Sequence, residues 1–374
     1  MGYVAVKGGT EAIENAAKLF TYERIKGKSR LLEIDQIREQ LYLAVDKVMG
    51  EGSLYAPDLA ALAIKQSVGD TFEAAFMLRA YRATRPRVGY SIPQSTTEMR
   101  VIRRISAAFK DVPGGQILGP TTDYTLRLLD FELLEESEQT RKAYSENLFK
   151  GLMDAESLPE SFSKVVDLMR SEGLLAERPG NPNPSSAGIY DVTRQSLTFP
   201  ASRSATLQSM ARGETGGMLL LAYSNMRGYG DVHPTVGELR VGYIPVKIRH
   251  RHSGKYYTVG EVKVTEAEVI AKFTTVEGSP KFTLGYGLCF GHNETKAISM
   301  AILDRAMQAE ERRAPSENQE FVLSHIDGID ALGFCAHWKL PHYVTFQSDL
   351  DRLRKAREVD NSSKVQKAEN HSET

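Results

Sequence analysis

A polar, proline-rich stretch near the middle of the chain, ERPGNPNPSSAG (residues 177–188), constrains the fold more than any other sequence feature. Proline lacks a backbone donor and glycine adopts many backbone conformations, so neither a helix nor a strand is expected to run through this stretch. It also contains no large apolar side chain that could be buried. We therefore predict a domain boundary here, between a domain of residues 1–176 and a domain of residues 189–350.

The part before this boundary is predicted to be mainly helical. Apolar residues recur there at helical spacing, first at Ile37, Leu41, Val45 and Val48. Further helices are expected to begin at Pro57 and after Asp70, which are residue types favoured at helix N-termini. The spacing of three more apolar residues predicts another helix: Ile102, Ile105 and Phe109. Residues 3–6 are expected to form a short strand that leads into a helix near Thr10.

The part after the boundary has the pattern of β-strands. Residues 239–248 and 256–264 are rich in β-branched and aromatic side chains and flank a turn, which predicts a hairpin. Residues 283–291 are expected to form a third strand, followed by a helix from 293 to about 308. Residues 351–374 carry many charges and few large apolar groups, so we expect a polar, flexible tail. Together these patterns predict an α+β fold.

Composition excludes several classes of protein. The 374 residues carry a formal net charge of −1, so no general electrostatic attraction to nucleic acid or to an anionic membrane is expected. Two cysteines are too few for a disulfide-rich scaffold and are typical of a reducing compartment. Neither a signal peptide nor a stretch of about 20 apolar residues is evident. The expected location is therefore cytoplasmic.

His337 and His342 are candidate metal ligands. They lie five residues apart, a spacing that does not place two side chains on one face of a helix, but Pro341 forces the chain to bend between them. Two imidazoles suit Zn, Fe, Ni or Cu, and a metal site needs three or four ligands. The remaining ligands would be His325, Asp327, a partner chain or the substrate. The alternative is that both are ordinary loop histidines.

Two glycine-rich segments contain further candidate residues. In residues 110–131, three glycines can bring backbone amides close to an anion, with Lys110 and Arg127 nearby and Asp123 among the carboxylates. The segment lacks the pattern of a Walker A motif, and a simple turn is the alternative. Residues 221–243 combine glycines with charged residues and a histidine: Arg227, Asp231, His233, Glu238 and Arg240. Such a set would suit a phosphorylated sugar, whereas the alternative is a surface loop that leads into the hairpin.

Four blocks of the sequence, taken together, resemble a known family. They are RRISAAFKDVPGGQILGPTTDYTLRLLDF (103–131), LAYSNMRGYGDVHPTVGELRVGYI (221–244), GYGLCFGHNETKAISMAILDRAMQ (285–308) and EFVLSHIDGIDALGFCAHWKLPHYVTFQ (320–347). The blocks and their order are similar to those of carbon–phosphorus lyase core-complex subunit I. The resemblance covers roughly residues 3–350, apart from a divergent region between about 135 and 195.

The resemblance implies a specific activity. Members of this family act in a cytoplasmic core complex with subunits G, H and J, where J is a radical S-adenosylmethionine enzyme, and ATP-binding-cassette subunits associate with the core. The chain would also form a homodimer within the core. With its partners it would displace adenine from C1′ of MgATP by an alkylphosphonate, which gives ribose 1-phosphonate 5-triphosphate. Alone, it would hydrolyse purine nucleoside triphosphates.

The resemblance also places a zinc ion on His337 and His342, near the contact with subunit J. Cleavage of an N-glycosidic bond passes through an oxocarbenium-like transition state, which requires negative charge near C1′. We expect Asp123 or Glu238 to supply it, with His233 as the donor to the departing purine. The residues expected to bind phosphate groups are Lys110, Arg227 and Arg240.

Two other functions fit the same residues. The chain could be a non-catalytic scaffold whose histidine pair completes a zinc site at the interface with the radical S-adenosylmethionine subunit. It could instead be a stand-alone zinc phosphohydrolase, which would release inorganic phosphate rather than adenine and would require more metal ligands than the histidine loop supplies.

Overall fold

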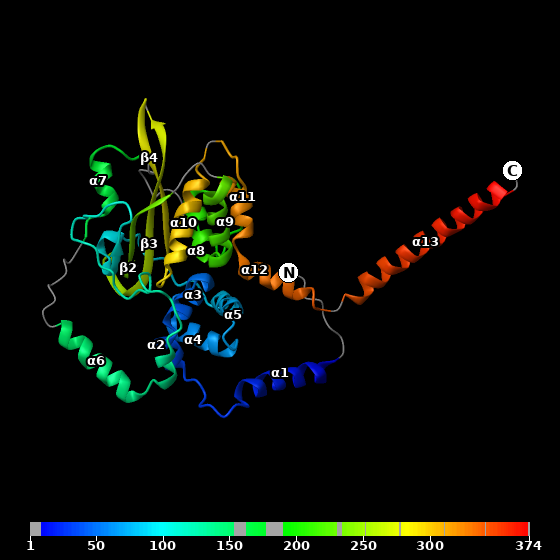
Figure 1. Ribbon diagram of the computed structural model, residues 1–374, viewed down its shortest axis with the longest axis horizontal. Helices are drawn as coiled ribbons and strands as arrows, with labels where there is room; N and C mark the ends of the chain where they lie inside the picture. The colour runs from blue at the N-terminus through cyan, green and yellow to red at the C-terminus, as the bar shows by residue number, and fades with distance from the viewer. Residues whose placement is uncertain are drawn as a thin grey trace. The chain divides into compact units, whose positions relative to one another are not determined.

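The protein has an α+β fold, as predicted, with an antiparallel sheet and helices packed against it (Figure 1). The computed structural model describes residues 9–152, 162–176, 190–229, 234–250, 252–276, 278–309, 311–340 and 342–372. The chain divides into two compact units, one of residues 32–329 and one of residues 1–31 together with 330–374. The strand expected at residues 3–6 and the linker at 177–188 lie outside the described residues.

The sheet has the strand order β1-β2-β3-β4, and every neighbouring pair is antiparallel. Its strands are β1 (Arg100–Ile105), β2 (Thr235–Arg249), β3 (Tyr256–Val276) and β4 (Ser279–Phe290). Strands β2 and β3 form the predicted hairpin, and β4 confirms the third predicted strand. Because β1 precedes residues 177–188 and pairs with β2, which follows them, both parts of the sequence contribute to one sheet. The compact units therefore divide the chain elsewhere than the boundary expected at 177–188.

Strand β1 corrects one prediction, because a helix was expected from the spacing of Ile102, Ile105 and Phe109. Residues 100–105 are instead a strand that pairs with β2, with a register shift before Arg103. Arg103 and Arg104 are both buried, and each forms an ion pair with a carboxylate. These partners lie far away in the sequence, so tertiary pairing overrides the helical spacing of the apolar residues.

The helices predicted between residues 35 and 83 are present and share an apolar core. They are α2 (Ile34–Gln40), α3 (Tyr42–Gly52), α4 (Pro57–Gln66) and α5 (Thr71–Ala83). Val48, Ala60 and Leu78 are among the buried residues that they pack together. Asp70 caps α5, because its side chain accepts hydrogen bonds from the backbone amides of Phe72 and Glu73. The end of α5 leads directly into a segment that lines the candidate site described below.

Helix α10 (Glu294–Ala306) follows β4 and packs against β3 and β4, which confirms the predicted strand-to-helix unit. A Cβ atom at Gly285 would lie 2.0 Å from the carbonyl oxygen of Ala301, so glycine permits this close approach. Further helices join α10 on the same side of the sheet in Figure 1. They are α8 (Arg203–Arg212), α9 (Thr215–Ser224) and α11 (Gln319–His325). Their shared core includes Met218, Leu239 and Met300.

The larger unit contains further helical elements. They are η1 (Thr96–Glu98), η2 (Phe131–Glu135), α6 (Glu138–Leu152), α7 (Val165–Ser171), η3 (Asn225–Tyr229) and η4 (Pro315–Glu317). Helix α12 (Gly328–His337) spans the boundary between the two units.

The smaller unit contains α1 (Thr10–Ile25) and α13 (Tyr343–Ser372). Helix α13 includes most of the tail that was expected to be flexible. Charged pairs three residues apart support it, among them Arg354 and Asp351 at 3.7 Å. None of the described helices is long and apolar enough to span a membrane.

Candidate functional site

The two histidines predicted to bind metal converge. His337 ends α12 and His342 immediately precedes α13, and their ring centroids are 5.3 Å apart. The Nδ1 atom of His337 lies against the carbonyl oxygen of Phe334, and that of His342 lies 2.6 Å from the carbonyl oxygen of Leu340. A carbonyl oxygen can only accept, so each Nδ1 carries the proton and each Nε2 presents a lone pair. This arrangement suits a zinc ligand, whose second nitrogen is normally held in the same way.

The other proposed metal ligands on the chain are His325 and Asp327. His325 and Asp327 lie in the larger unit, whereas His337 and His342 lie in the smaller one. The Nδ1 atom of His325 also faces a backbone carbonyl oxygen, that of Phe321, which leaves its Nε2 atom for a metal, and Asp327 pairs with Arg79 at 2.8 Å. No group of three or more potential metal ligands occurs in the described part of the chain. The histidine pair offers two of the three or four ligands that a metal site needs.

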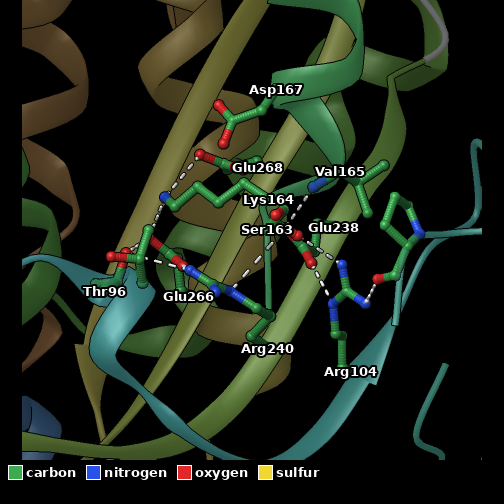
Figure 2. A network of polar contacts seen from close by, with 12 residues as sticks. Thr96, Arg104, Ser163, Lys164, Val165, Asp167, Glu238, Arg240, Glu266 and Glu268 are labelled. Atoms are coloured by element: carbon green, nitrogen blue, oxygen red, sulfur yellow. Dashed lines mark hydrogen bonds and ion pairs between the residues drawn. The ribbon is translucent and has the colours of Figure 1, made fainter. Parts of the chain in front are cut away.

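Glu238 and Arg240, which the sequence suggested as site residues, belong to a buried set of charged side chains on the sheet (Figure 2). We call this set the buried charge network, and its members are Arg104, Lys164, Glu238, Arg240, Glu266 and Glu268. The ions come from β1, β2 and β3 and from the residue that precedes α7.

Glu266 lies at the centre of the network. Its carboxylate accepts hydrogen bonds from Nε of Arg240 at 3.0 Å and from Nζ of Lys164 at 2.9 Å. Hydroxyl groups of Thr96 and Tyr286 donate to it as well, at 2.7 and 2.9 Å. Burial alone would raise the pKa of Glu266, but the two cations and these hydrogen bonds lower the pKa to about 2. Glu266 is therefore ionised at neutral pH and fully engaged by the protein.

Glu238 is held in a similar way and is only 2% exposed. One carboxylate oxygen accepts from Nε of Arg104 at 2.6 Å, and the other accepts from the backbone amide of Val165 at 3.0 Å. Arg104 also donates to backbone carbonyls, including that of Ser163 at 2.8 Å. Both oxygens of Glu238 are thus used to connect β2 with β1 and with the start of α7. Arg240, 1% exposed, is directed at Glu266 rather than at solvent.

Glu268 is the least compensated member of the network. It contacts Lys164 at 3.0 Å, while its Oε2 atom has no hydrogen-bond partner. Burial raises the pKa of Glu268, the nearby Glu266 raises it further, and Lys164 only partly opposes this shift.

The first glycine-rich segment is folded against β1. A Cβ atom at Gly119, whose φ is +63°, would lie 2.5 Å from the carbonyl oxygen of Ile102, so this glycine allows close packing. Asp123 forms an ion pair with the buried Arg103, but its own side chain is 39% exposed and thus accessible. Lys110 is exposed and has no described ion-pair partner.

The second glycine-rich segment is described only in part. Arg227 lies in η3, where its guanidinium group is exposed and donates to the hydroxyl of Tyr223 at 3.0 Å. His233 and Asp231 lie outside the described residues. Among the predicted phosphate-binding and catalytic residues, the structure brings together Glu238 and Arg240, whose Oε2 and Nε atoms are 4.0 Å apart.

A cavity of about 780 Å³ in the larger unit provides a different candidate site. Five arginines line it: Arg82, Arg85, Arg87, Arg194 and Arg212. We call it the arginine cavity. Asp191 is the one acidic residue among the described residues that line it, and this carboxylate already accepts from Arg87 at 2.8 Å and from the backbone amide of Thr193 at 3.0 Å. The charge of the cavity lining is therefore strongly positive.

Arg82 is the partly buried member of this set that forms no described ion pair with a carboxylate. Its Nε atom is buried without a hydrogen-bond partner, and no ion pair is found for it within the described residues. Burial lowers the pKa of Arg82, and the positive charges of Arg212 and Arg79 lower it further, to about 10. Arg82 remains charged at neutral pH but is held among like charges.

The sequence predictions missed this cavity, although one signal for it was present. Residues 79–87, RAYRATRPR, contain four arginines within nine positions. The other lining segments are far away in sequence, from residues 190–194, from α8 and from strands β2 to β4. The arginine run can be seen in the sequence, but the cavity that it lines cannot.

The chain matches a family of known proteins along nearly its entire length. Residues 2–360 fit the model of the family described as bacterial phosphonate metabolism protein (PhnI). The chain belongs to the PhnI family. This confirms the resemblance to carbon–phosphorus lyase subunit I found in the sequence.

Three curated relatives cover the same length. A protein of Stutzerimonas stutzeri named putative C-P lyase subunit protein HtxH is 55% identical over 95% of each chain. A protein of Rhizobium meliloti named alpha-D-ribose 1-methylphosphonate 5-triphosphate synthase subunit PhnI is 46% identical over 95% of each chain. A protein of Escherichia coli with the same name is 46% identical over 96% of this chain and 99% of its own.

Proposed function

We propose that this chain is a subunit of a carbon–phosphorus lyase complex and acts in ribose 1-phosphonate 5-triphosphate synthesis. The observation that carries the proposal is the full-length match to the PhnI family, with relatives that are named as subunits of this synthase. The proposed substrates are MgATP and an alkylphosphonate. A phosphonate oxygen attacks C1′ of the ribose, the C1′–N9 bond breaks, and adenine departs with a proton.

The chain's own residues would stabilise positive charge at C1′ and hold the triphosphate. Asp123 is the better placed of the two proposed carboxylates, because it is 39% exposed whereas both oxygens of Glu238 are engaged in the protein interior. An anion close to C1′ would favour the oxocarbenium-like transition state. We retain His233 as the proposed donor to adenine and Lys110 and Arg227 as phosphate contacts. Arg240, which is buried against Glu266, is better explained as a structural cation.

The proposed metal is zinc on His337 and His342, in addition to the magnesium that accompanies ATP. The donor set fits, because the Nδ1 atom of each ring is engaged by a backbone carbonyl and each Nε2 atom is left for a metal. When bound, zinc would supply Lewis-acid stabilisation of phosphate or phosphonate oxygens. Two ligands do not complete a zinc shell, which agrees with a site shared with another subunit.

The proposed partners are subunits G, H and J, ATP-binding-cassette subunits and a second copy of this chain, in a cytoplasmic complex. Exposed apolar side chains support extensive protein contacts. In residues 126–134, several are more than two-thirds exposed: Leu126, Leu128, Leu129, Phe131 and Leu134. Contiguous exposed apolar residues are typical of interaction surfaces.

Product analysis tests this function directly. The chain, with and without its partner subunits, would be incubated with MgATP and methylphosphonate, and the products resolved by phosphorus NMR and by chromatography of free adenine. We expect adenine together with a ribose 1-phosphonate product. Inorganic phosphate without adenine would contradict the proposal and favour the zinc phosphohydrolase.

The second candidate function is a non-catalytic scaffold, which the incomplete zinc ligand set favours. Loss of adenine formation in Asp123→Asn, with unchanged assembly of the complex, would contradict the scaffold. Absence of product under every condition, with stable binding to subunit J, would support it.

A further inference from the structure

The arginine cavity has no role in the chemistry proposed so far. Its positive charge favours the binding of an anionic ligand. Arg82, Arg85, Arg87, Arg194 and Arg212 line about 780 Å³, and Asp191 is the acidic residue among the described lining residues. We propose that the arginine cavity binds the polyphosphate chain of a nucleotide. The identity of the nucleotide as a purine nucleoside triphosphate rests on the proposed function, whereas the polyphosphate chemistry rests on the cavity.

Arg82 provides the strongest argument for an anionic ligand. Its neighbours Arg79 and Arg212 have a protein carboxylate, Asp327, whose oxygens lie 2.8 and 3.6 Å from their guanidinium nitrogens. Arg82 forms no ion pair with a carboxylate among the described residues, Asp191 opposes the lowering of its pKa only in part, and its Nε atom is buried without a hydrogen-bond partner. Arg82 is partly buried, and a partly desolvated cation among like charges is stabilised when an anion pairs with it. A phosphate group would supply both the charge and the hydrogen-bond acceptors that Arg82 lacks.

The distribution of the arginines fits a chain of phosphates better than a single small anion. Arg82, Arg85 and Arg87 follow one another at the end of α5, while Arg194 and Arg212 come from two other segments. Guanidinium groups from several segments can bind successive phosphates in forked, two-pronged hydrogen bonds. The volume lies within the range of pockets that enclose a ligand of nucleotide size.

The remainder of the lining would suit the base and the ribose. Tyr90 and Tyr190 supply aromatic rings, and apolar side chains complete the lining: Leu54, Ile244, Val264, Leu288 and Phe290. Aromatic and apolar surfaces of this kind accept the flat face of a purine. The cavity therefore combines a cationic part for phosphates with an apolar part for a base.

The competing explanation is that these arginines stabilise the fold. It holds for Arg87, which pairs with Asp191 at 2.8 Å, but not for Arg82. If Arg82 were structural, its replacement would destabilise the protein. If Arg82 instead binds an anionic ligand, Arg82→Gln relieves like-charge repulsion in the ligand-free protein. This variant should then be at least as stable as the wild type. The two explanations predict opposite signs for one measurement.

The test is calorimetric titration of the full chain, within its complex as purified, without any phosphonate. The probes are inorganic tripolyphosphate, MgATP and adenosine. We expect tripolyphosphate and MgATP to bind and adenosine to bind far more weakly. Arg82→Gln and Arg85→Gln should each weaken tripolyphosphate binding about tenfold or more, since each removes a charge-assisted contact. Arg141→Gln, a change at an arginine whose side chain is 71% exposed on α6, is the matched control and should bind like the wild type.

Two results would overturn the inference: no binding of tripolyphosphate by the wild type, or unchanged affinity in both cavity variants. Arg85 is exposed, so its variant remains informative even if Arg82→Gln does not fold. The outcome is separable from that of the proposed function. Tripolyphosphate binding without any adenine release would contradict the proposed function and support this inference. Adenine release with unaltered tripolyphosphate binding in both variants would support the proposed function and contradict this inference.

Discussion

The buried charge network and the arginine cavity both concentrate charged side chains in the larger unit, yet they differ in how many of these charges have a partner of opposite sign. In the network, Glu266 accepts from Arg240 and Lys164, and Glu238 accepts from Arg104. In the cavity, the lining contains five arginines and one acidic residue, Asp191, which already pairs with Arg87. A cluster of charges in a sequence therefore does not identify a binding site by itself. What separates the two regions is whether the protein supplies the partners of its own charges.

This difference changes which residues are candidates for function. The network contains Glu238 and Arg240, which chemical reasoning about the sequence selected. Glu238 accepts from Arg104 and from the backbone amide of Val165, and Arg240 donates to Glu266. The cavity contains Arg82, which was not selected and which forms no ion pair with a carboxylate among the described residues. The network thus acts mainly in stability, and the cavity in binding.

The largest expected effect is that of Glu266→Gln. This change leaves Arg240 and Lys164 buried without their main counter-charge, and breaking a buried ion pair costs about 3–5 kcal/mol. Urea unfolding at pH 7 would measure the loss. Glu146→Gln, at an exposed position of α6, is the control and should stay within about 0.5 kcal/mol of the wild type. A Glu266 variant as stable as this control would contradict the structural role of the network.

The loss of stability at acid pH should depend on the same carboxylate, that of Glu266. The folded protein lowers the pKa of Glu266 from 4.5 to about 2, so the unfolded chain binds the proton more tightly. The contribution of Glu266 is therefore complete above pH 4.5 and is lost as the pH falls toward 2, by about 3 kcal/mol in total. Unfolding measured between pH 6 and pH 2.5 should show this loss in the wild type and a shallower dependence in Glu266→Gln. Equal slopes would mean that Glu266 is not the responsible group.

Smaller effects on stability are expected for variants of Glu238 and Asp123, and they should distinguish the roles of the two carboxylates. Glu238→Gln keeps one acceptor but weakens the ion pair with Arg104, so we expect a stability loss of about 1–3 kcal/mol. Adenine release per folded molecule should remain close to that of the wild type. Asp123→Asn should instead lower kcat about 100-fold with little change in stability, because the buried Arg103 keeps its second carboxylate, Glu294, at 2.6 Å. The reverse pattern, with activity lost only in the Glu238 variant, would restore Glu238 as the catalytic carboxylate.

Much of the fold followed from local sequence patterns. The β2–β3 hairpin and the β4–α10 unit could be predicted, because alternating apolar residues and a helix start at Asn293 are local signals. Strand β1 could not, since its two buried arginines are stabilised by carboxylates distant in the sequence. Helix α13 was missed because its support comes from charged pairs rather than from an apolar face.

The two candidate sites also differ in how far they could be predicted from the sequence. The convergence of His337 and His342 could be anticipated, because the bend that brings them together lies between them in the sequence. The arginine cavity could not be anticipated, because residues of α5, α8 and three strands come together only in the folded chain.

The measurement that tests the central contrast most directly is thermal unfolding of three proteins, each with and without tripolyphosphate. These are the wild type, Glu266→Gln and Arg82→Gln. We predict that Glu266→Gln lowers the Tm but keeps the ligand-induced rise, whereas Arg82→Gln keeps the Tm and loses that rise. If Arg82→Gln instead lowers the Tm and still shows the full ligand-induced rise, the distinction between a compensated structural network and an uncompensated binding cavity is wrong.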